Sequence, residues 1–313
     1  MAQWQAAPMT RDQHWTAADL PNLSGATFVV TGATSGLGAI TARELARAGG
    51  HVVLAVRSVV RGQRLAATLT GSTEVRRLDL ADLSSIRAFA SEWDGPLDVL
   101  VNNAGVMAIP RTVTVDGFEM QFSTNHLGPF ALTNLLLPYI TDRVVTVASN
   151  AHRRRGIDIN FEDIHSESSY SPWRAYQQSK LANLLFTREL QRRLTKSGSQ
   201  VTAHAVHPGY AATNLQARTA SRTQRLVLAL TNRLFAQSDM MGALPSLYAA
   251  TQPLPGGSYT GPGGRGELRG HPAPAQMSPY ALDEYRARKL WALSAKLTSV
   301  NFADIPRDSG HAS

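Results

Sequence analysis

From residue 27 onward, short runs of apolar and β-branched residues alternate with longer amphipathic stretches, and this alternation strongly constrains the fold of the 313-residue chain. Nearly continuous apolar runs are typical of strands that are buried on both faces of a parallel sheet. Because crossovers between parallel strands are right-handed, we expect a single doubly wound α/β domain with helices on both faces. The expected strands are 27–30, 51–56, 74–78, 97–101, 143–148 and 201–206; the expected helices are 39–48, 61–69, 84–93, 125–139, 173–196 and 280–298.

The domain is expected to cover residues 25–300, because no linker interrupts this pattern. An N-terminal extension (1–24) precedes it, and a tail (301–313) that is expected to be disordered follows it. Residues 252–279 are rich in Gly and Pro and are expected to form an irregular loop. No apolar run reaches the roughly 18 residues of a membrane span, and the first 25 residues lack the apolar core of a secretory signal. We therefore expect a cytoplasmic protein.

Composition excludes several kinds of chemistry. The chain has no Cys, so disulfides, thiolate catalysis and Cys-based metal sites are ruled out, and we expect no metal. The net charge of +8 is uneven: residues 1–150 carry 11 Lys and Arg against 12 Asp and Glu, whereas residues 151–313 carry 20 against 11. No basic run is interleaved with aromatic residues, so we expect no nucleic-acid partner. The basic half could equally be solvated surface together with a site for an anionic cofactor.

A glycine-rich turn follows the first expected strand and opens the first helix. Glycines at this position let backbone N–H groups approach a pyrophosphate, which the helix N-terminus attracts. The spacing is Gly-x-x-x-Gly-x-Gly, which differs from the commonest dinucleotide fingerprint. The turn predicts a dinucleotide site of Rossmann type formed by Gly32, Thr34, Ser35, Gly36, Leu37 and Gly38.

The second expected strand ends in Arg57 and has no acidic residue there. An acid at this position binds a ribose 2′-hydroxyl, whereas an arginine accommodates a 2′-phosphate. We therefore expect NADP(H) as the cofactor in preference to NAD(H); the alternative is an ordinary surface arginine. Asp79 ends the third strand and either meets the adenine or caps the next helix. The fourth strand ends in Asn102-Asn103-Ala104-Gly105, small residues where the backbone passes close to a ligand.

Tyr176 and Lys180 are four residues apart in an expected helix, which places both side chains on one face. A nearby ammonium favours a phenolate and lowers the pKa of the phenol. Only four of the 31 basic residues are Lys, so the use of Lys at position 180 is unusual for this chain. The pair is a candidate acid/base, although such spacing also occurs on ordinary solvated helix faces.

Taken together, these motifs resemble the classical short-chain dehydrogenase/reductase family over about residues 25–250. Within that family the chain looks most like the retinol-dehydrogenase-like branch. The gap of 27 positions between Ser149 and Tyr176 fits the insertion of that branch, whereas Pro129 and Ala148 depart from its usual residues. The matching motifs are Thr31-Gly32-x-x-x-Gly36-x-Gly38, Asp79-Leu80, Asn102-Asn103-Ala104-Gly105, Asn125, Ser149, Tyr176-x-x-x-Lys180 and Pro208-Gly209-x-x-x-Thr213.

The resemblance implies a catalytic role for each of four residues. Tyr176 would exchange a proton with the substrate oxygen, which Ser149 would hydrogen-bond. Lys180 would hold the nicotinamide ribose and lower the pKa of Tyr176, and Asn125 would hold a water and Lys180 in a proton relay. Taken alone, Ser149 could equally cap the next turn. The implied cofactor contacts also include Leu80, Asn103, which would brace the sheet, Ala104, Gly105, Pro208, Gly209 and Thr213.

The segment after Gly209 is expected to cover the substrate. Leu226, Leu230 and Leu234 recur at helical spacing in a 222–235 helix, which could be a lid, a peripheral membrane contact or simple core packing. The loop that begins His152-Arg153 is expected to be solvated. We expect an oxidoreductase that interconverts a carbonyl and an alcohol of a lipophilic small molecule; a non-catalytic dinucleotide sensor or scaffold, and a sugar-nucleotide epimerase, are the alternatives. Whether the chain forms a homodimer is open.

Overall fold

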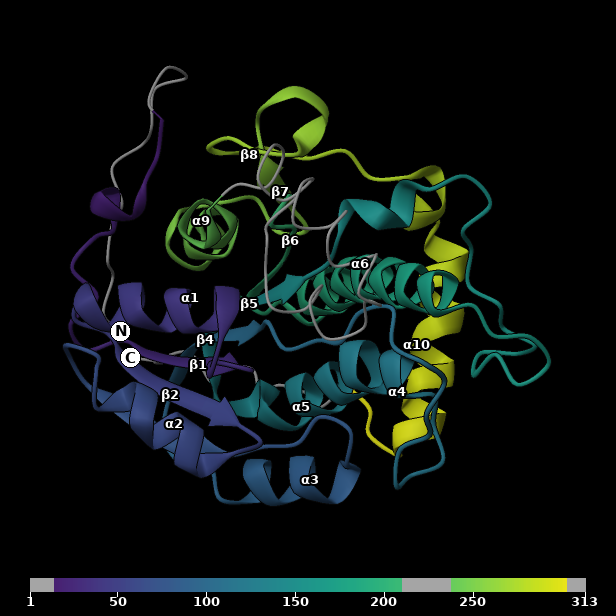
Figure 1. Ribbon diagram of the computed structural model, residues 1–313, viewed down its shortest axis with the longest axis horizontal. Coiled ribbons are helices and arrows are strands. Elements are labelled where there is room, and N and C mark those ends of the chain that lie inside the picture. The colour runs from purple at the N-terminus through teal and green to yellow at the C-terminus, as the bar shows by residue number, and fades with distance from the viewer. Residues whose placement is uncertain (1–13, 210–237, 303–313) are drawn as a thin grey trace, which may run out of the picture.

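The computed structural model describes residues 14–209 and 238–302, and its centre is an eight-stranded sheet (Figure 1). The strand order is β3-β2-β1-β4-β5-β6-β7-β8, and every neighbouring pair is parallel except β7 and β8. Strand order therefore reverses between β1 and β4, at the switch point where ligands bind in doubly wound sheets. The strands are β1 (Thr27–Thr31), β2 (His51–Val56), β3 (Thr73–Arg77), β4 (Leu97–Asn102), β5 (Ile140–Val147), β6 (Thr202–Val206), β7 (Tyr259–Pro262) and β8 (Pro272–Pro274).

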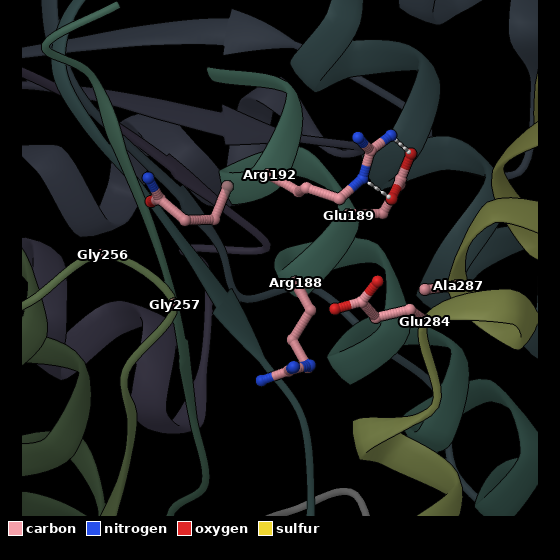
Figure 2. A pocket seen from close by; sticks show the side chains of 8 residues that line it. Arg188, Glu189, Arg192, Gly256, Gly257, Glu284 and Ala287 are labelled. Atoms are coloured by element: carbon pink, nitrogen blue, oxygen red, sulfur yellow. Dashed lines mark hydrogen bonds and ion pairs between the residues drawn. The ribbon is translucent and has the colours of Figure 1, made fainter. Parts of the chain in front are cut away.

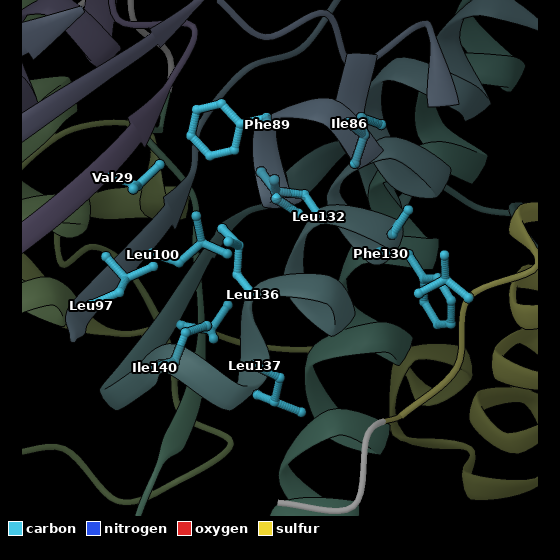
Figure 3. Close-up of a cluster of buried hydrophobic side chains, with 14 of the residues drawn as sticks. Val29, Ile86, Phe89, Leu97, Leu100, Phe130, Leu132, Leu136, Leu137 and Ile140 are labelled. Carbon is cyan, nitrogen blue, oxygen red and sulfur yellow. The ribbon is translucent and has the colours of Figure 1, made fainter. Parts of the chain in front are cut away.

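Helices cover both faces of this sheet, as the alternation of the sequence predicts. Neighbouring residues of a strand point to opposite faces: Val29 belongs to the buried cluster under α3, α5, α6 and α10, and Val30 to the cluster under α1 and α9. The first cluster also contains Phe89, Leu100 and Phe130 (Figure 3). The helices are α1 (Gly36–Arg47), α2 (Val59–Ala66), α3 (Leu83–Ser91), α4 (Met120–Phe122), α5 (Gly128–Leu136), α6 (Pro172–Ser197), α9 (Asp239–Thr251) and α10 (Glu284–Thr298).

The six expected strands are all present, but residues 252–279 are not an irregular loop. They contain β7 and β8, which extend the sheet beyond β6. The prediction fails because the two strands have only four and three residues, and Gly and Pro within them mask the strand pattern. Helix α9 lies next to α1 (Figure 1) and was not expected from the sequence; its Pro245 is buried inside it.

Part of the N-terminal extension packs against this domain. Trp15 is buried, and its ring meets the edge of the Tyr248 ring of α9 at 5.3 Å between centroids. The backbone oxygen of Trp15 lies 3.0 Å from Nδ1 of His271. An aromatic side chain buried in this way contributes substantially to a core, so residues 14–24 help to cover α9.

Helix α6 carries the Tyr-Lys pair and is well delimited. Pro172 stands at its first turn, where a missing N–H costs nothing, and Gly198 ends it in the left-handed conformation (φ 77°). Before α5, a π-helical turn (η2, Ser123–Leu127) contains Asn125. π-helical turns are rare in proteins, but those that occur often lie at functional sites. They redirect side chains, and here the turn places the Asn125 amide beside α6.

Candidate active site

The carboxyl ends of β1 to β6 lie along one edge of the parallel sheet. Many of the sequence-predicted site residues follow these ends, whereas Asn125 lies in a π-helical turn and Tyr176 and Lys180 lie on α6. Gly32 and Gly36 take left-handed conformations (φ 67° and 54°), which favour glycine. A Cβ on Gly32 would lie 2.9 Å from Ala104, and one on Gly38 would overlap the Asn103 amide. The turn therefore needs its glycines in order to lie against the end of β4.

Asn103 and Thr31 join the two central strands at this edge. Nδ2 of Asn103 donates to the backbone oxygen of Thr31 at 2.8 Å. The side-chain hydroxyl of Thr31 accepts from the backbone N–H groups of Asn103 and Ala104, both at 3.0 Å. The bracing role expected for Asn103 thus has a concrete geometry. Ser35 stands at the N-cap of α1 but makes no side-chain cap bond, so its hydroxyl and the first N–H groups of α1 remain open to an anion.

Arg57 and Asp79 flank the place where a ribose and an adenine would lie. Arg57 follows β2, is exposed, and makes no ion pair with another described residue. The Oδ1 of Asp79 accepts from the N–H of Ala81 at 3.0 Å, whereas Asp82 caps α3. Asp79 is therefore not the helix cap that was its alternative interpretation. Leu80 is buried, and its oxygen lies where a side chain at Gly128 would stand.

Tyr176, Ser149 and Lys180 come together at the ends of α6 and β5. Nζ of Lys180 lies 5.7 Å from the centre of the Tyr176 ring, and the Ser149 hydroxyl is close enough to the Tyr176 phenol to lower its pKa. Ser149 also caps the following turn by accepting from the N–H of Ala151 at 3.2 Å. The turn-cap interpretation of Ser149 is thus observed, and its hydrogen bond to a substrate oxygen stays a prediction.

Burial dominates the electrostatics of this group. Tyr176 is 7% exposed, and burial raises its pKa although the nearby Ser149 hydroxyl opposes the shift. The expected lowering of the Tyr176 pKa is therefore not found in this structure, because desolvation of the phenolate outweighs any help from Lys180. Lys180 is 4% exposed, and burial lowers its own pKa to about 8. A phenol with a raised pKa is protonated near neutral pH and can donate.

Lys180 and Asn125 are held by backbone groups. Nζ of Lys180 donates to the oxygen of Val147, the last residue of β5, at 2.9 Å. The Asn125 amide bonds both backbone groups of Val106, accepting at 2.7 Å and donating at 2.9 Å, and it also donates to the Ser179 hydroxyl at 2.9 Å. Asn125 thus fastens the chain after β4 to α6, one residue before Lys180.

The backbone that follows β6 is also tightly packed. Gly209 has φ 69°, and a side chain there would overlap the backbone oxygen of Leu268. Thr213 and the expected 222–235 helix lie outside the described residues. The segment that begins at His152 is solvated only in part: Arg154 and Arg155 are exposed as expected, whereas His152 is buried and Arg153 forms an ion pair with Glu267 at 3.0 Å. The sequence signal that was overlooked is the position of His152 only three residues after Ser149.

A cavity of about 230 Å³ lies away from these residues, between α6, the 256–257 turn and α10 (Figure 2). Its charged groups are partly satisfied among themselves, since Arg192 bonds both oxygens of Glu189 at 2.7 Å. No site residue lines it, so it has no part in the catalytic centre. The lining residues are Arg188, Glu189, Gln191, Arg192, Gly256, Gly257, Glu284 and Ala287.

Comparison with known proteins decides the family. The model of the short chain dehydrogenase family matches residues 26–224. The chain belongs to the short-chain dehydrogenase family. It is 40% identical to mouse retinol dehydrogenase 14 over 96% of this chain and 95% of the relative, and 40% identical to mouse polyprenol dehydrogenase over 91% and 87%. A crystal structure of a putative uncharacterized protein from Mycobacterium paratuberculosis is 54% identical, with a TM-score of 0.81 over 93% of this chain and 100% of that one.

Membership in the short-chain dehydrogenase family makes the chain an oxidoreductase of the alcohol/carbonyl type that uses NAD(P)(H). The resemblance inferred from its motifs is confirmed, including the retinol-dehydrogenase-like branch. The doubly wound fold is likewise confirmed. Between residues 14 and 209 and between 238 and 302, no helix is long and apolar enough to span a bilayer.

Proposed function

We propose that this short-chain dehydrogenase uses NADP(H) to interconvert a carbonyl and an alcohol of a lipophilic small molecule, with Tyr176 as the general acid/base. The observation that carries the proposal is the grouping of three side chains: Ser149 at the end of β5, the buried Tyr176 phenol on α6, and Lys180, whose Nζ lies 5.7 Å from the centre of the Tyr176 ring. These three groups are what proton transfer to a carbonyl oxygen requires.

The residues around the switch point fit a dinucleotide. Gly32 and Gly38 leave a cradle that any Cβ would fill, and the uncapped start of α1 offers N–H groups to a pyrophosphate. Thr34, Ser35, Gly36 and Leu37 would line this phosphate site. Asp79 and Leu80 would border the adenine, and Asn103, Ala104, Gly105, Pro208, Gly209 and Thr213 would border the nicotinamide side.

The bound nicotinamide would supply or accept the hydride, and the protein would handle the proton. In the reductive direction, the Tyr176 hydroxyl donates its proton to the carbonyl oxygen while the Ser149 hydroxyl donates a hydrogen bond to the same oxygen. In the oxidative direction, the tyrosinate takes the alcohol proton. The ammonium of Lys180 favours that tyrosinate, and its neighbour Asn125 would complete a relay that returns the proton to solvent.

Arg57 supports NADP(H) over NAD(H). Its guanidinium is exposed and forms no ion pair with any residue in the described part of the chain, so it is available to a 2′-phosphate. Charge-assisted bonds between arginine and phosphate are strong and specific. No acidic residue ends β2 to bind a 2′-hydroxyl instead.

An exposed aromatic surface supports a lipophilic substrate. Trp173 is 54% exposed, and its ring meets the Tyr176 ring edge-on at 6.1 Å. Leu268, whose backbone touches Gly209, is also exposed. Large apolar side chains beside a reactive group are suited to an apolar ligand. The relatives named retinol dehydrogenase and polyprenol dehydrogenase suggest substrates of this kind.

A non-catalytic sensor is the weaker alternative, because it would have no chemical need for all of Asn125, Ser149, Tyr176 and Lys180. A sugar-nucleotide epimerase shares the Tyr-x-x-x-Lys pair but is disfavoured by the spacing between Gly32 and Gly36. The remaining predictions, a domain over 25–300, a cytoplasmic location with peripheral membrane contact, and a homodimer, stay part of the proposal.

The direct test offers wild-type protein NADPH or NADH together with aliphatic aldehydes and ketones of graded chain length. We expect NADPH oxidation that is coupled to alcohol formation and that improves with chain length. Failure to reduce any carbonyl, or faster turnover with NADH, contradicts the proposal.

A further inference from the structure

Three chain segments meet at the carboxylate of Glu267, and two of them border proposed site residues, Ser149 and Gly209. Oε1 accepts from Nη1 of Arg153 at 3.0 Å and from the backbone N–H of Gln276 at 3.1 Å, and Oε2 lies 3.1 Å from Nε2 of His207. Arg153 comes four residues after Ser149, and His207 comes two residues before Gly209. One side chain therefore ties the segment that leaves Ser149 to the segment that leaves β6.

The backbone of Glu267 shows how firmly this arrangement is held. Glu267 has φ 56°, a left-handed conformation that is uncommon for residues other than glycine. Its side chain is 15% exposed, so its charge is largely removed from water and depends on its partners. Residues held in such conformations cluster at functional sites, where the surroundings fix them.

His207 has a defined hydrogen-bonding pattern. Its Nδ1 accepts from the backbone N–H of Gly209 at 3.2 Å, so the ring proton lies on Nε2 and is donated to Glu267. Burial lowers the pKa of His207 to about 4, so the ring is neutral. A side chain at Gly261 would overlap this ring. His207 thus transmits the position of Glu267 directly to the backbone of Gly209.

A parallel chain of contacts reaches Ser149. Nδ1 of His152 lies 2.6 Å from the backbone oxygen of Ser149. Nε2 of His152 accepts from the backbone N–H of Ser278 at 3.2 Å. The Tyr259 ring contacts both histidines, with centroids 5.7 Å from His152 and 5.2 Å from His207. The two segments are therefore also joined by a buried aromatic layer.

We propose that Glu267 is a positioning residue of the active site, which fixes the Ser149 loop and the Gly209 segment relative to each other through Arg153 and His207. It touches no reacting atom. Its effect is on the alignment of the groups that do, and misplacement by about 1 Å can cost about 100-fold in rate. The proposal rests on the reductase activity proposed above.

The test compares Glu267→Ala, Glu267→Gln and Arg153→Ala with a control, Glu284→Ala, which removes an exposed carboxylate of α10 that pairs with Arg288. Each is assayed well below its melting temperature for kcat, for KM of the carbonyl, and for the kinetic isotope effect with deuterated NADPH. Hydrogen exchange of peptides covering 149–153 and 207–209 is measured without cofactor.

For Glu267→Ala we expect kcat to fall by roughly 10- to 100-fold, the isotope effect to rise as hydride transfer becomes limiting, and exchange to quicken in both peptides. Glu267→Gln keeps an acceptor for His207, so it should recover most of the rate, and Arg153→Ala should quicken exchange chiefly in 149–153. The control should match wild type.

The proposal is overturned if Glu267→Ala keeps the wild-type kcat and isotope effect, or if its loss of rate equals its unfolded fraction with no local change in exchange. If Glu267→Ala does not fold, wild-type behaviour of Arg153→Ala in both kinetics and exchange refutes it equally. If wild-type protein reduces no carbonyl, the proposed function fails, while hydrogen exchange still tests the link through Glu267.

Discussion

Replacing the buried Lys180 with Met should stabilise the protein near neutral pH while it removes activity. Burial lowers the Lys180 pKa from its ordinary 10.5 to about 8. Since one pKa unit corresponds to about 1.4 kcal/mol, holding the ammonium in the folded state costs about 3 kcal/mol at pH 7. Met fills a similar volume without a charge.

The change also removes the hydrogen bond from Lys180 to the Val147 oxygen. That oxygen keeps a second donor, Nδ2 of Asn183 at 3.1 Å, so it is not left unsatisfied. The lost bond is worth about 1 kcal/mol. The net expectation is therefore a gain of about 2 kcal/mol in the free energy of unfolding at pH 7.

The stability advantage of Lys180→Met over wild type should decrease as the pH rises. Below about pH 8 Lys180 is charged in both folded and unfolded protein, and the full cost is present. Between about pH 8 and 10.5 the unfolded chain binds a proton that the folded protein does not, so wild-type stability rises relative to the variant. The advantage of Lys180→Met should therefore vanish near pH 10.

Urea denaturation followed by circular dichroism at pH 7 and pH 10 measures both effects. The control is Lys296→Met, because Lys296 is exposed on α10 and its replacement should change stability by no more than about 0.5 kcal/mol. A Lys180→Met variant that is less stable than wild type at pH 7, or whose advantage does not depend on pH, would refute the reasoning.

Two further predictions concern ligand recognition. Arg57→Ala should weaken NADPH binding by roughly 10- to 100-fold, the value of a charge-assisted bond, and leave NADH binding unchanged. Nucleotide fluorescence titrations measure both affinities, with the exposed Arg64→Ala as control, and equal losses for both nucleotides would argue against a 2′-phosphate contact. Trp173→Ala should raise KM roughly tenfold for long-chain carbonyls only, because the apolar contact area is lost; a shift of the same size for short carbonyls, or for the control Tyr285→Ala, would contradict it.

The central strands and the edge that holds the site could be predicted because their signals are local. The apolar runs of β1, β2, β4, β5 and β6 and the glycine turn after β1 each lie within a few residues. The carboxyl ends of parallel strands meet at one edge, so the glycine turn, Asn103 and Ser149 could be expected to lie together. That Tyr176 of α6 acts with Ser149, 27 positions earlier, was implied only by the family resemblance.

The features that could not be predicted from the sequence depend on burial and on contacts between residues far apart in the chain. The sign of the Tyr176 pKa shift follows from desolvation, which a sequence does not display. Glu267 lies 114 positions from Arg153 and 60 from His207, within a Gly-rich stretch that reads as loop. Strand β8 pairs only through three residues, two of them Pro, and Pro normally argues against a strand.

The most direct test of the account is the turnover of Tyr176→Phe, measured as carbonyl-dependent loss of NADPH beside wild type. Phe keeps the ring packing against Trp173 and removes only the hydroxyl, so the fold and NADPH affinity should be preserved. General acid catalysis is worth about 10²- to 10⁴-fold, and we predict a loss of that size in kcat. Equal turnover by Tyr176→Phe and wild type would contradict the central claim.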